Sequence, residues 1–325
     1  MKIELDKFLN DSRTFYRIIT WIAFAILASA GQAAADDKKH QIEALRVETL
    51  ADNIEAGSGG VAIDAAGNVY TADFGSRLGR GGEGGHRVYK IKPGGEVNLF
   101  AQGFRGASGN CFDANGNLFQ SNIGGSFISK VTPQGEVSKF STGGYANPVG
   151  IVPDQQGNLF VCNCGNGSIR KTTKDGQSTE FVKSPLLKCP NGITIDRNGN
   201  LYTANFYNGD VIKITPDAEV SKLATIPGNN NGHLTFHGNS LFVIARSAHQ
   251  IYRVTLDGDI SLFAGSGERG KADGKPLEST FSLPNDIGVS PDGKYMYVNE
   301  VSPITGSPQI LAPTRVRRIV LRDHQ

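Results

Sequence analysis

Side chains that carry oxygen recur at one point of a repeated pattern, directly after a short apolar stretch. These strand-end positions are Asp73, Asn122, Asn163, Asn205 and Glu300, and the sixth one holds Ala245. Carboxylate and carboxamide oxygens are ligands that Ca²⁺, Mg²⁺ and Mn²⁺ prefer. Asp or Asn at the end of a strand also often accepts hydrogen bonds from backbone N–H groups of the following turn. Both interpretations stay open, and the two carboxylates, Asp73 and Glu300, are the candidate catalytic residues.

A second set of residues lies just before the first strand of each repeat. These strand-start positions are Gly59, Ser108, Val149, Asn191, Asn231 and Asn285. His233 and Asp286 follow closely in two of the repeats, and Arg246 follows Ala245. A histidine or arginine at such a place binds an anionic or carbonyl group, or simply makes a local hydrogen bond. The candidate ligand-binding residues are Asn122, Asn163, Asn205, Asn231, His233 and Arg246.

The pattern that carries both sets recurs about every 40 to 50 residues, which is the length of one β-propeller blade. In each copy, alternating apolar residues lead into an Asp-x-x-Gly-Asn turn or a variant of it, and an aromatic residue or leucine follows. The copies start at Gly60, Gly109, Gly150, Gly192, Gly232 and Asp286. This pattern is typical of two half-buried strands joined by a hairpin. In a propeller, the strand-start and strand-end positions then meet at one mouth of the central channel.

A third and a fourth strand follow in each repeat, except that the sixth repeat lacks a fourth. The third strands begin at Arg87, Phe127, Ser168, Asp210, Gln250 and Arg315. The missing strand is found near the other end of the chain, where RVETLA (residues 46–51) matches EVSKLA (residues 219–224) in its apolar positions. The sequence therefore predicts an all-β fold, a six-bladed β-propeller with four-stranded blades, whose ring is closed by an N-terminal strand.

Two segments resemble a known family. Residues 192–214, GITIDRNGNLYTANFYNGDVIKI, resemble an NHL repeat, and residues 263–298 resemble the linker and blade start of bacterial NHL proteins. The same six-bladed arrangement is shared with the senescence marker protein and gluconolactonase family, whose blades also open with Asn-Gly or Asn-Asp before the first strand. Here these pairs are Asn191-Gly192 and Asn285-Asp286.

The resemblance implies a metal site and an activity. Gluconolactonase-type enzymes hold one divalent ion with a glutamate, an asparagine and an aspartate at strand-start positions. By resemblance, Asn191 and Asn285, with Asp286 nearby, would hold a divalent cation (Ca²⁺, Mg²⁺, Mn²⁺ or Zn²⁺), although Gly59 stands at the glutamate position. The implied reaction is hydrolysis of a lactone or ester whose carbonyl the ion polarises, while Asp73 or Glu300 assists the attacking water.

Composition restricts the class of partner. The 325 residues include 33 Lys and Arg against 31 Asp and Glu, without a segment that gathers the cations. We therefore expect a small-molecule ligand or substrate and no nucleic acid, while a protein partner remains possible. The alternative to a hydrolase is a non-catalytic propeller that binds a ligand or a protein, and a lyase or isomerase on the same scaffold is also open.

The N-terminal segment predicts export. An apolar run at residues 18–30 follows two arginines and precedes Ala33-Ala34-Ala35, so we expect a signal peptide over residues 1–35, with an uncleaved anchor as the alternative. Residues 36–325 would then form one periplasmic or secreted domain that does not associate with a membrane. Export permits disulfides. Of the four cysteines, Cys164 and Cys189 are the expected pair if one forms, because both are predicted to lie near one mouth.

Overall fold

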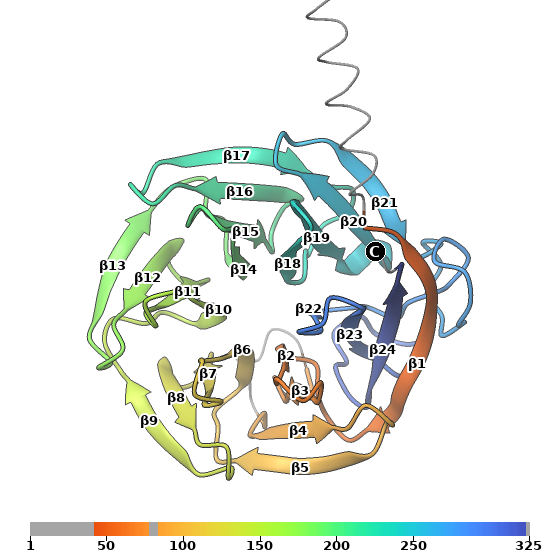
Figure 1. Cartoon of the computed structure of the whole chain (residues 1–325), viewed down its shortest axis with the longest axis horizontal. Helices are drawn as coiled ribbons and strands as arrows, with labels where there is room; N and C mark the ends of the chain where they lie inside the picture. The colour runs from red at the N-terminus through yellow and green to blue at the C-terminus, as the bar shows by residue number, and fades with distance from the viewer. Residues whose placement is uncertain (1–41, 78–83, 323–325) are drawn as a thin grey trace, which may run out of the picture. The chain divides into compact units, whose positions relative to one another are not determined.

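The computed structural model describes residues 42–77 and 84–322, and their strands form six four-stranded antiparallel sheets. The sheets are the blades of a ring around a central channel (Figure 1). The six-bladed all-β propeller predicted from the repeats is confirmed. The predicted signal segment lies outside the described residues. Within the described part of the chain, no helix is long and apolar enough to span a membrane.

Each of blades one to five is built from four consecutive strands. Blades one and two are β2 (Val61–Ile63), β3 (Val69–Ala72), β4 (Arg87–Ile91), β5 (Val97–Gln102), and β6 (Ala107–Phe112), β7 (Leu118–Asn122), β8 (Phe127–Val131), β9 (Val137–Ser141). Blades three and four are β10 (Pro148–Pro153), β11 (Leu159–Asn163), β12 (Ser168–Thr172), β13 (Ser178–Lys183), and β14 (Pro190–Ile195), β15 (Leu201–Asn205), β16 (Asp210–Ile214), β17 (Val220–Thr225). Blade five is β18 (Leu234–His237), β19 (Ser240–Ala245), β20 (Gln250–Thr255) and β21 (Ile260–Ala264), with the 3₁₀ turn η1 (Arg246–Ala248) after β19.

Blade six closes the ring by joining the two ends of the propeller. It contains β22 (Ile287–Val289), β23 (Tyr295–Val301) and β24 (Thr314–Leu321), and its outermost strand is β1 (Ala44–Ile54). Arg46 pairs with Val320 and Val47 pairs with Ile319 in the antiparallel register of β1 and β24. This is the pairing predicted from RVETLA, in which an N-terminal strand completes the last blade. It covers the edge that β24 would otherwise expose.

The core lies between neighbouring blades. In one cluster, Phe160 and Ile169 of blade three pack with Leu201 and Ile212 of blade four, and all four side chains are buried. Burying an apolar side chain of this size contributes about 1.5–3 kcal/mol relative to leaving it exposed. The alternating apolar residues of the repeats therefore pack each blade against the next.

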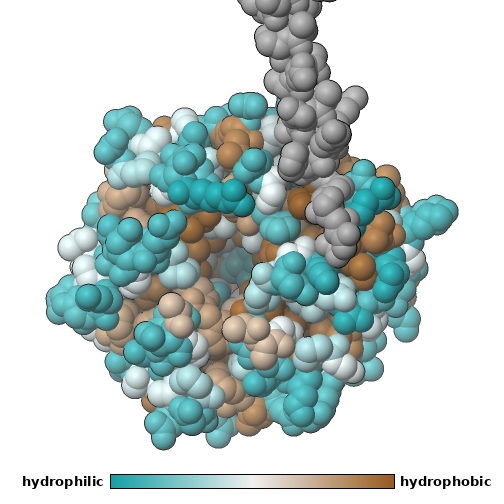
Figure 2. Space-filling model, viewed as in Figure 1, coloured by the Kyte–Doolittle hydropathy of each residue, from teal (hydrophilic) through white to brown (hydrophobic). Residues whose placement is uncertain are grey.

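Glycines bring the innermost strands close together around the channel. A Cβ on Gly109 would lie 2.4 Å from Val149 O of the next blade, and a Cβ on Gly150 would lie 2.4 Å from Asn191 O. No side chain fits at that separation without moving the backbone, which makes glycine the expected residue there. The face of the propeller shown in Figure 2 is hollowed at its centre, and hydrophobic residues surround the hollow.

Candidate functional site

A cavity of about 360 Å³ lies at the mouth of the channel where the innermost strands begin. We call it the mouth cavity. Its polar lining residues are Ser58, Ser108, Asn191, His233, Arg246, Asn285 and Gln309. Its apolar lining comprises Phe74, Ile123, Val149, Phe206, Tyr207 and Leu311, together with the disulfide Cys164–Cys189. The Cys164–Cys189 pairing expected from the sequence is confirmed, and it joins the residue after β11 of blade three to the residue before β14 of blade four.

The register of blade five differs from the expected one by a single residue. Gly59 N donates to Ala72 O in blade one, and Gly232 N donates to Ile244 O in blade five. Gly232 is therefore the strand-start residue of blade five, and the assignment of Asn231 to that position is wrong. The reason lies in the hairpin that follows. In this hairpin His237 pairs with Ser240, so Gly238 and Asn239 alone form the turn, which is shorter than the Asp-x-x-Gly-Asn turns of the other blades.

The corrected register places two polar residues where glycine recurs. His233 in blade five and Asp286 in blade six hold the position that is glycine in blades one to four. The equivalent glycines are Gly60, Gly109, Gly150 and Gly192. The equivalence is also visible between blades, since Gly60 N donates to Ser108 O and His233 N donates to Asn285 O at matching points. Aligning Leu234-Thr235-Phe236 with Ile193-Thr194-Ile195 in the sequence would have revealed it.

His233 and Asp286 form a buried pair. Nδ1 of His233 lies 3.1 Å from Oδ2 of Asp286, and both side chains are at least nine-tenths buried. The Asp286 carboxylate is held in turn by backbone groups, because Val61 N donates to Oδ2 at 2.7 Å and Ile287 N donates to Oδ1 at 2.7 Å. The carboxylate therefore fixes the ring so that Nδ1 carries the proton and Nε2 has the free lone pair.

The position of His233 relates two cavities. It lines the mouth cavity and also a smaller channel cavity of about 260 Å³, to which Asp286 and Asn110 belong. Nε2 of His233 makes no hydrogen bond with any described residue, and both polar side-chain atoms of Asn110 are buried without a protein partner. Buried polar atoms of this kind usually bind ordered water. His233 thus lies in the wall of both cavities.

The strand-end side chains lie elsewhere than at the cavity surface. Asn122, Asn163 and Asn205 are fully buried. Each Oδ1 accepts a backbone N–H from the loop that leads into its own blade, at 2.9–3.2 Å. Asp73 is also buried and accepts hydrogen bonds from Gly75 N and His86 N. Burial raises the pKa of its carboxyl, although the two hydrogen bonds act to lower it. None of the four lines the mouth cavity.

Glu300 is the most heavily engaged of the strand-end residues. Its Oε2 accepts from Ser282 N at 2.6 Å, and its Oε1 lies 3.0 Å from both Arg315 Nη1 and Arg317 Nη1. Arg315 also pairs with Asp52 and Arg317 with Asp273, so a network ties blade six to its outer strand and to the loop before it. Burial raises the pKa of Glu300, while Arg317 and Arg315 oppose this shift. The carboxylate has no oxygen left for a substrate.

Of the three residues expected to hold a cation, two are neutral carboxamides and the third, Asp286, is engaged elsewhere. Asn191 and Asn285 line the mouth cavity, where Nδ2 of Asn191 donates to Asn231 O and Nδ2 of Asn285 donates to Gly59 O. Both oxygens of Asp286 are already in use. Within residues 42–77 and 84–322, no group of three His, Cys, Asp or Glu residues is placed to hold a metal ion. Two neutral carboxamides do not fit the divalent cation that the resemblance implies, because such ions are held mainly by carboxylates.

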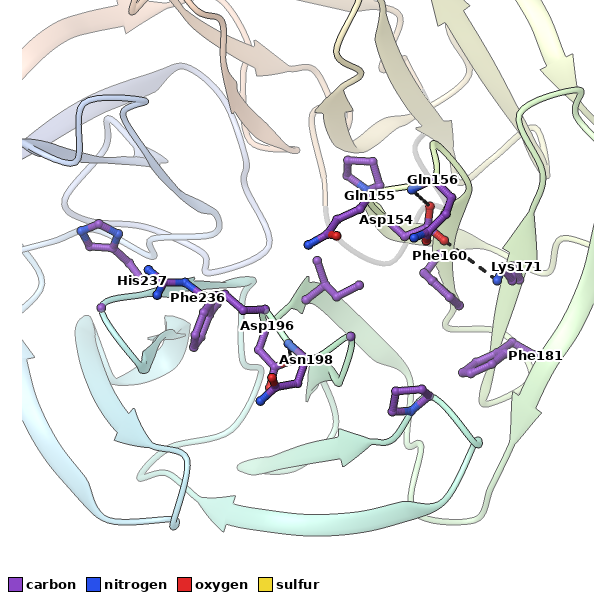
Figure 3. A pocket seen from close by; sticks show the side chains of 16 residues that line it. Asp154, Gln155, Gln156, Phe160, Lys171, Phe181, Asp196, Asn198, Phe236 and His237 are labelled. Carbon is purple, nitrogen blue, oxygen red and sulfur yellow. Dashed lines mark hydrogen bonds and ion pairs between the residues drawn. The ribbon is translucent and has the colours of Figure 1, made fainter.

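A larger cavity of about 650 Å³ lies at the opposite end of the inner strands, among the hairpin turns of blades three to five (Figure 3). Its carboxylates serve the turns. Asp154 accepts from Gln156 N and pairs with Lys171 at 3.9 Å, and Asp196 caps its own turn in the same way. Burial and the charge of Arg197 lower the pKa of His237 there. The cavity thus combines satisfied turn residues with no oriented catalytic pair.

Comparisons with solved structures agree with the fold. The chain is 14% identical to virginiamycin B lyase from Staphylococcus aureus, covering 86% of this chain and 100% of that one with a TM-score of 0.60. It is 15% identical to a gluconolactonase from Xanthomonas campestris, covering 86% and 90% with a TM-score of 0.63. It is 13% identical to an auxiliary nutrient binding protein from Bacteroides thetaiotaomicron, covering 87% and 78% with a TM-score of 0.69.

These neighbours share a propeller architecture and differ in what they do. No protein-family model matches the chain, and no curated protein matches its sequence. A variant of the Staphylococcus aureus lyase with one histidine replaced by alanine is described as catalytically inactive. At such low identities the likeness shows the fold alone, so the chemistry must be argued from the site.

Proposed function

We propose that this propeller is a hydrolase of small esters or lactones, and that His233 is its general base. The observation that carries the proposal is the His233–Asp286 pair at the floor of the mouth cavity, with Nδ1 held by the carboxylate and Nε2 unpartnered. A buried imidazole oriented by a carboxylate is the arrangement that general-base catalysis requires. The pair replaces two glycines of the repeat, so the fold does not need it for packing.

The proposed reaction uses the two nitrogens of His233 in different ways. Nε2 takes a proton from a water molecule while the water oxygen attacks the carbonyl carbon of the ester. Asp286 stabilises the imidazolium that forms. When the tetrahedral intermediate collapses, the bond from carbon to the leaving oxygen breaks, and Nε2 returns the proton to that oxygen. The products are a carboxylic acid and an alcohol, or a hydroxy acid from a lactone.

Serine hydroxyl groups stand near the same floor. Ser58 and Ser108 both line the cavity and are largely buried, and the side-chain oxygen of Ser58 makes no hydrogen bond with a described residue. A free hydroxyl is able to donate to the oxyanion of the intermediate, which is the kind of contact that lowers the barrier in acyl transfer. We propose that Ser58 and Ser108 provide this hydrogen bond to the oxyanion.

The divalent cation expected by resemblance has no step in this proposal. If it bound, it would polarise the substrate carbonyl, but the carboxamides of Asn191 and Asn285 lack the carboxylate that such an ion needs. We therefore expect hydrolysis to be unchanged by EDTA. A loss of activity with EDTA that Ca²⁺, Mg²⁺, Mn²⁺ or Zn²⁺ restores would show that the metal-dependent reaction is the correct one.

The test is hydrolysis of 4-nitrophenyl acetate and of the aromatic lactone dihydrocoumarin. We expect turnover by the wild type and a fall in kcat/KM of roughly 10²- to 10⁴-fold in His233→Asn. Asp286→Asn should lower kcat/KM less, because the histidine stays in place. His237→Asn is the matched control, since this histidine lines the opposite cavity. Wild-type activity in His233→Asn would refute the general-base assignment. Absence of turnover in the wild type would favour the non-catalytic binding propeller.

We also propose that the mature protein is exported. The apolar run at residues 18–30 and the small residues before Asp36 support cleavage after Ala35. Mass spectrometry of protein recovered from the periplasm or the culture medium should find Asp36 as the N-terminal residue. An intact N-terminus in the membrane fraction would support the anchor alternative.

A further inference from the structure

Arg246 is a buried cation in the wall of the mouth cavity. Its side chain follows β19 of blade five and is 3% exposed. Its Nη1 donates to Leu283 O at 2.6 Å and its Nη2 donates to Pro308 O at 3.4 Å. Both acceptors are uncharged backbone carbonyls. No carboxylate of the described chain pairs with it, and its Nε has no partner there.

The surroundings add positive charge. Burial, with the charge of nearby Arg269, lowers the pKa of Arg246 to about 10. Among the described residues, the side chain of Arg269 bonds Ser282 Oγ and the carbonyls of Gly306 and Pro303, and all three acceptors are uncharged. The buried carboxylate of Glu300, which accepts from Ser282 N, is already bonded to two other arginines. The guanidinium thus stays charged at neutral pH in a place where residues 42–77 and 84–322 supply no counter-ion.

An unpaired buried charge is costly unless something compensates it. The contrast with Arg315 and Arg317 shows how this chain treats its other buried arginines, since both pair with Glu300 at 3.0 Å. Arg246 differs because it lines the mouth cavity. The missing partner therefore has room to be a bound anion.

We propose that the mouth cavity binds an organic carboxylate through Arg246. A guanidinium bonds a carboxylate with two parallel N–H···O contacts, which are short and strong when water is excluded. The apolar residues Phe74, Phe206 and Leu311 line the same cavity and suit the carbon skeleton of such a ligand. Tyr207, 68% exposed and in edge contact with Phe206, extends this apolar side to the rim.

The inference rests on the proposed function in naming the substrate class. If His233 hydrolyses an ester or lactone, the substrate carries a separate carboxylate that Arg246 holds while the carbonyl lies at Nε2. Arg246 is then a binding and specificity residue and takes no part in proton transfer. Inorganic anions lack the carbon skeleton, and we expect them to bind much more weakly.

Binding is tested without any need for turnover. Benzoate, phenylacetate and 4-phenylbutyrate are titrated into the wild type by calorimetry, each beside its neutral amide. We expect at least one acid to bind about tenfold or more tightly than its amide, and we expect Arg246→Gln to remove that preference. Arg105→Gln is the matched control, because Arg105 is exposed and makes no contact with the cavity.

Several results would overturn the proposal. They are equal binding of acid and amide by the wild type, no binding of any acid, an unchanged acid preference in Arg246→Gln, or competition by inorganic phosphate as strong as that by the acids. The comparison of acid with amide in the wild type decides the matter even if Arg246→Gln fails to fold.

A kinetic arm separates this inference from the proposed function. The ratio of kcat/KM for 4-carboxyphenyl acetate to kcat/KM for phenyl acetate should fall in Arg246→Gln, and the same ratio should stay at the wild-type value in Arg105→Gln. If neither ester is hydrolysed by the wild type, the hydrolase proposal fails while the binding titrations still decide whether Arg246 holds a carboxylate.

Discussion

Blades two to four and blades five and six follow the same repeat but use its special positions differently. In blades two to four, the innermost position is glycine and the strand-end asparagine holds the loop before its own blade. In blades five and six, histidine and aspartate replace the glycine. The strand end holds Ala245 followed by Arg246 in blade five, and Glu300 in blade six. The regular blades thus show what the fold requires, and the two others show what has been added to it.

The difference locates the site more reliably than residue type does. The sequence offers a ring of oxygen-bearing side chains, yet the structure uses nearly all of them to satisfy backbone N–H groups. The residues that break the repeat, His233, Asp286 and Arg246, have the free nitrogen, the oriented carboxylate and the unpaired charge. Departures from a consistent local pattern are expected at functional sites, because elsewhere they would only cost stability.

The largest expected effect concerns the strand-end position in the two regions. Glu300→Ala should lower the free energy of unfolding by about 3–5 kcal/mol, because it removes the buried carboxylate that Arg315 and Arg317 share and leaves them the part-exposed Asp52 and Asp273. The equivalent change in a regular blade, Asn163→Ala, should cost about 1–2 kcal/mol, the loss of a turn-holding hydrogen bond. Urea unfolding of both variants measures the difference. Equal costs would contradict the distinction between the blades.

The glycine position provides the next test. Gly150→Ala places a Cβ 2.4 Å from Asn191 O, and we expect a cost of about 1–3 kcal/mol from the resulting shift of the backbone. Gly94→Ala is the matched control, since a Cβ there meets nothing within 4 Å. Melting temperatures of the two variants decide the matter. A loss no greater in Gly150→Ala than in Gly94→Ala would show that close packing does not require the glycine.

A smaller effect is expected from pH in blade five. Burial, with the charges of Arg269 and Arg246, lowers the pKa of His249, whose Nδ1 accepts from Leu283 N. The unfolded chain, with a pKa of about 6.5, binds this proton more readily than the folded protein does. Above about pH 6.5, His249 is neutral in both states and does not change the free energy of unfolding. Below about pH 6.5, the unfolded chain takes up the proton first, so the free energy of unfolding declines as the pH falls.

His249→Asn keeps an acceptor for Leu283 N and removes the titrating group. Urea unfolding at pH 7.5 and pH 5.5 should show a smaller acid-induced loss of stability in His249→Asn than in the wild type. His237, whose pKa burial also lowers, contributes equally to both proteins. The same loss in the two proteins would indicate that His249 does not carry this dependence.

The fold could be predicted from the sequence because the same strand pattern occurs in six copies. The alternating apolar residues, the hairpin turns and the match of residues 46–51 to an outer strand predicted six blades, ring closure and the Cys164–Cys189 pair. The site was less readable. The turn after His237 makes this hairpin one residue shorter than those of blades one to four, so the repeat alignment placed His233 one position too far along the strand. Glu300 is bonded to Arg315 and Arg317, which lie on the next strand, and the repeat pattern does not indicate that contact. A repeat alignment does not show which oxygens the backbone already occupies.

The most direct test restores the repeat in the two unusual blades. In the double variant His233→Gly/Asp286→Gly, both positions carry the glycine found in blades one to four. Because glycine fits this position, we expect a folded propeller with only a modest drop in melting temperature, since each glycine costs roughly 0.5–1 kcal/mol. Hydrolysis of 4-nitrophenyl acetate should be lost. Hydrolysis at the wild-type rate by the folded double variant would contradict the claim that these two residues form the catalytic site.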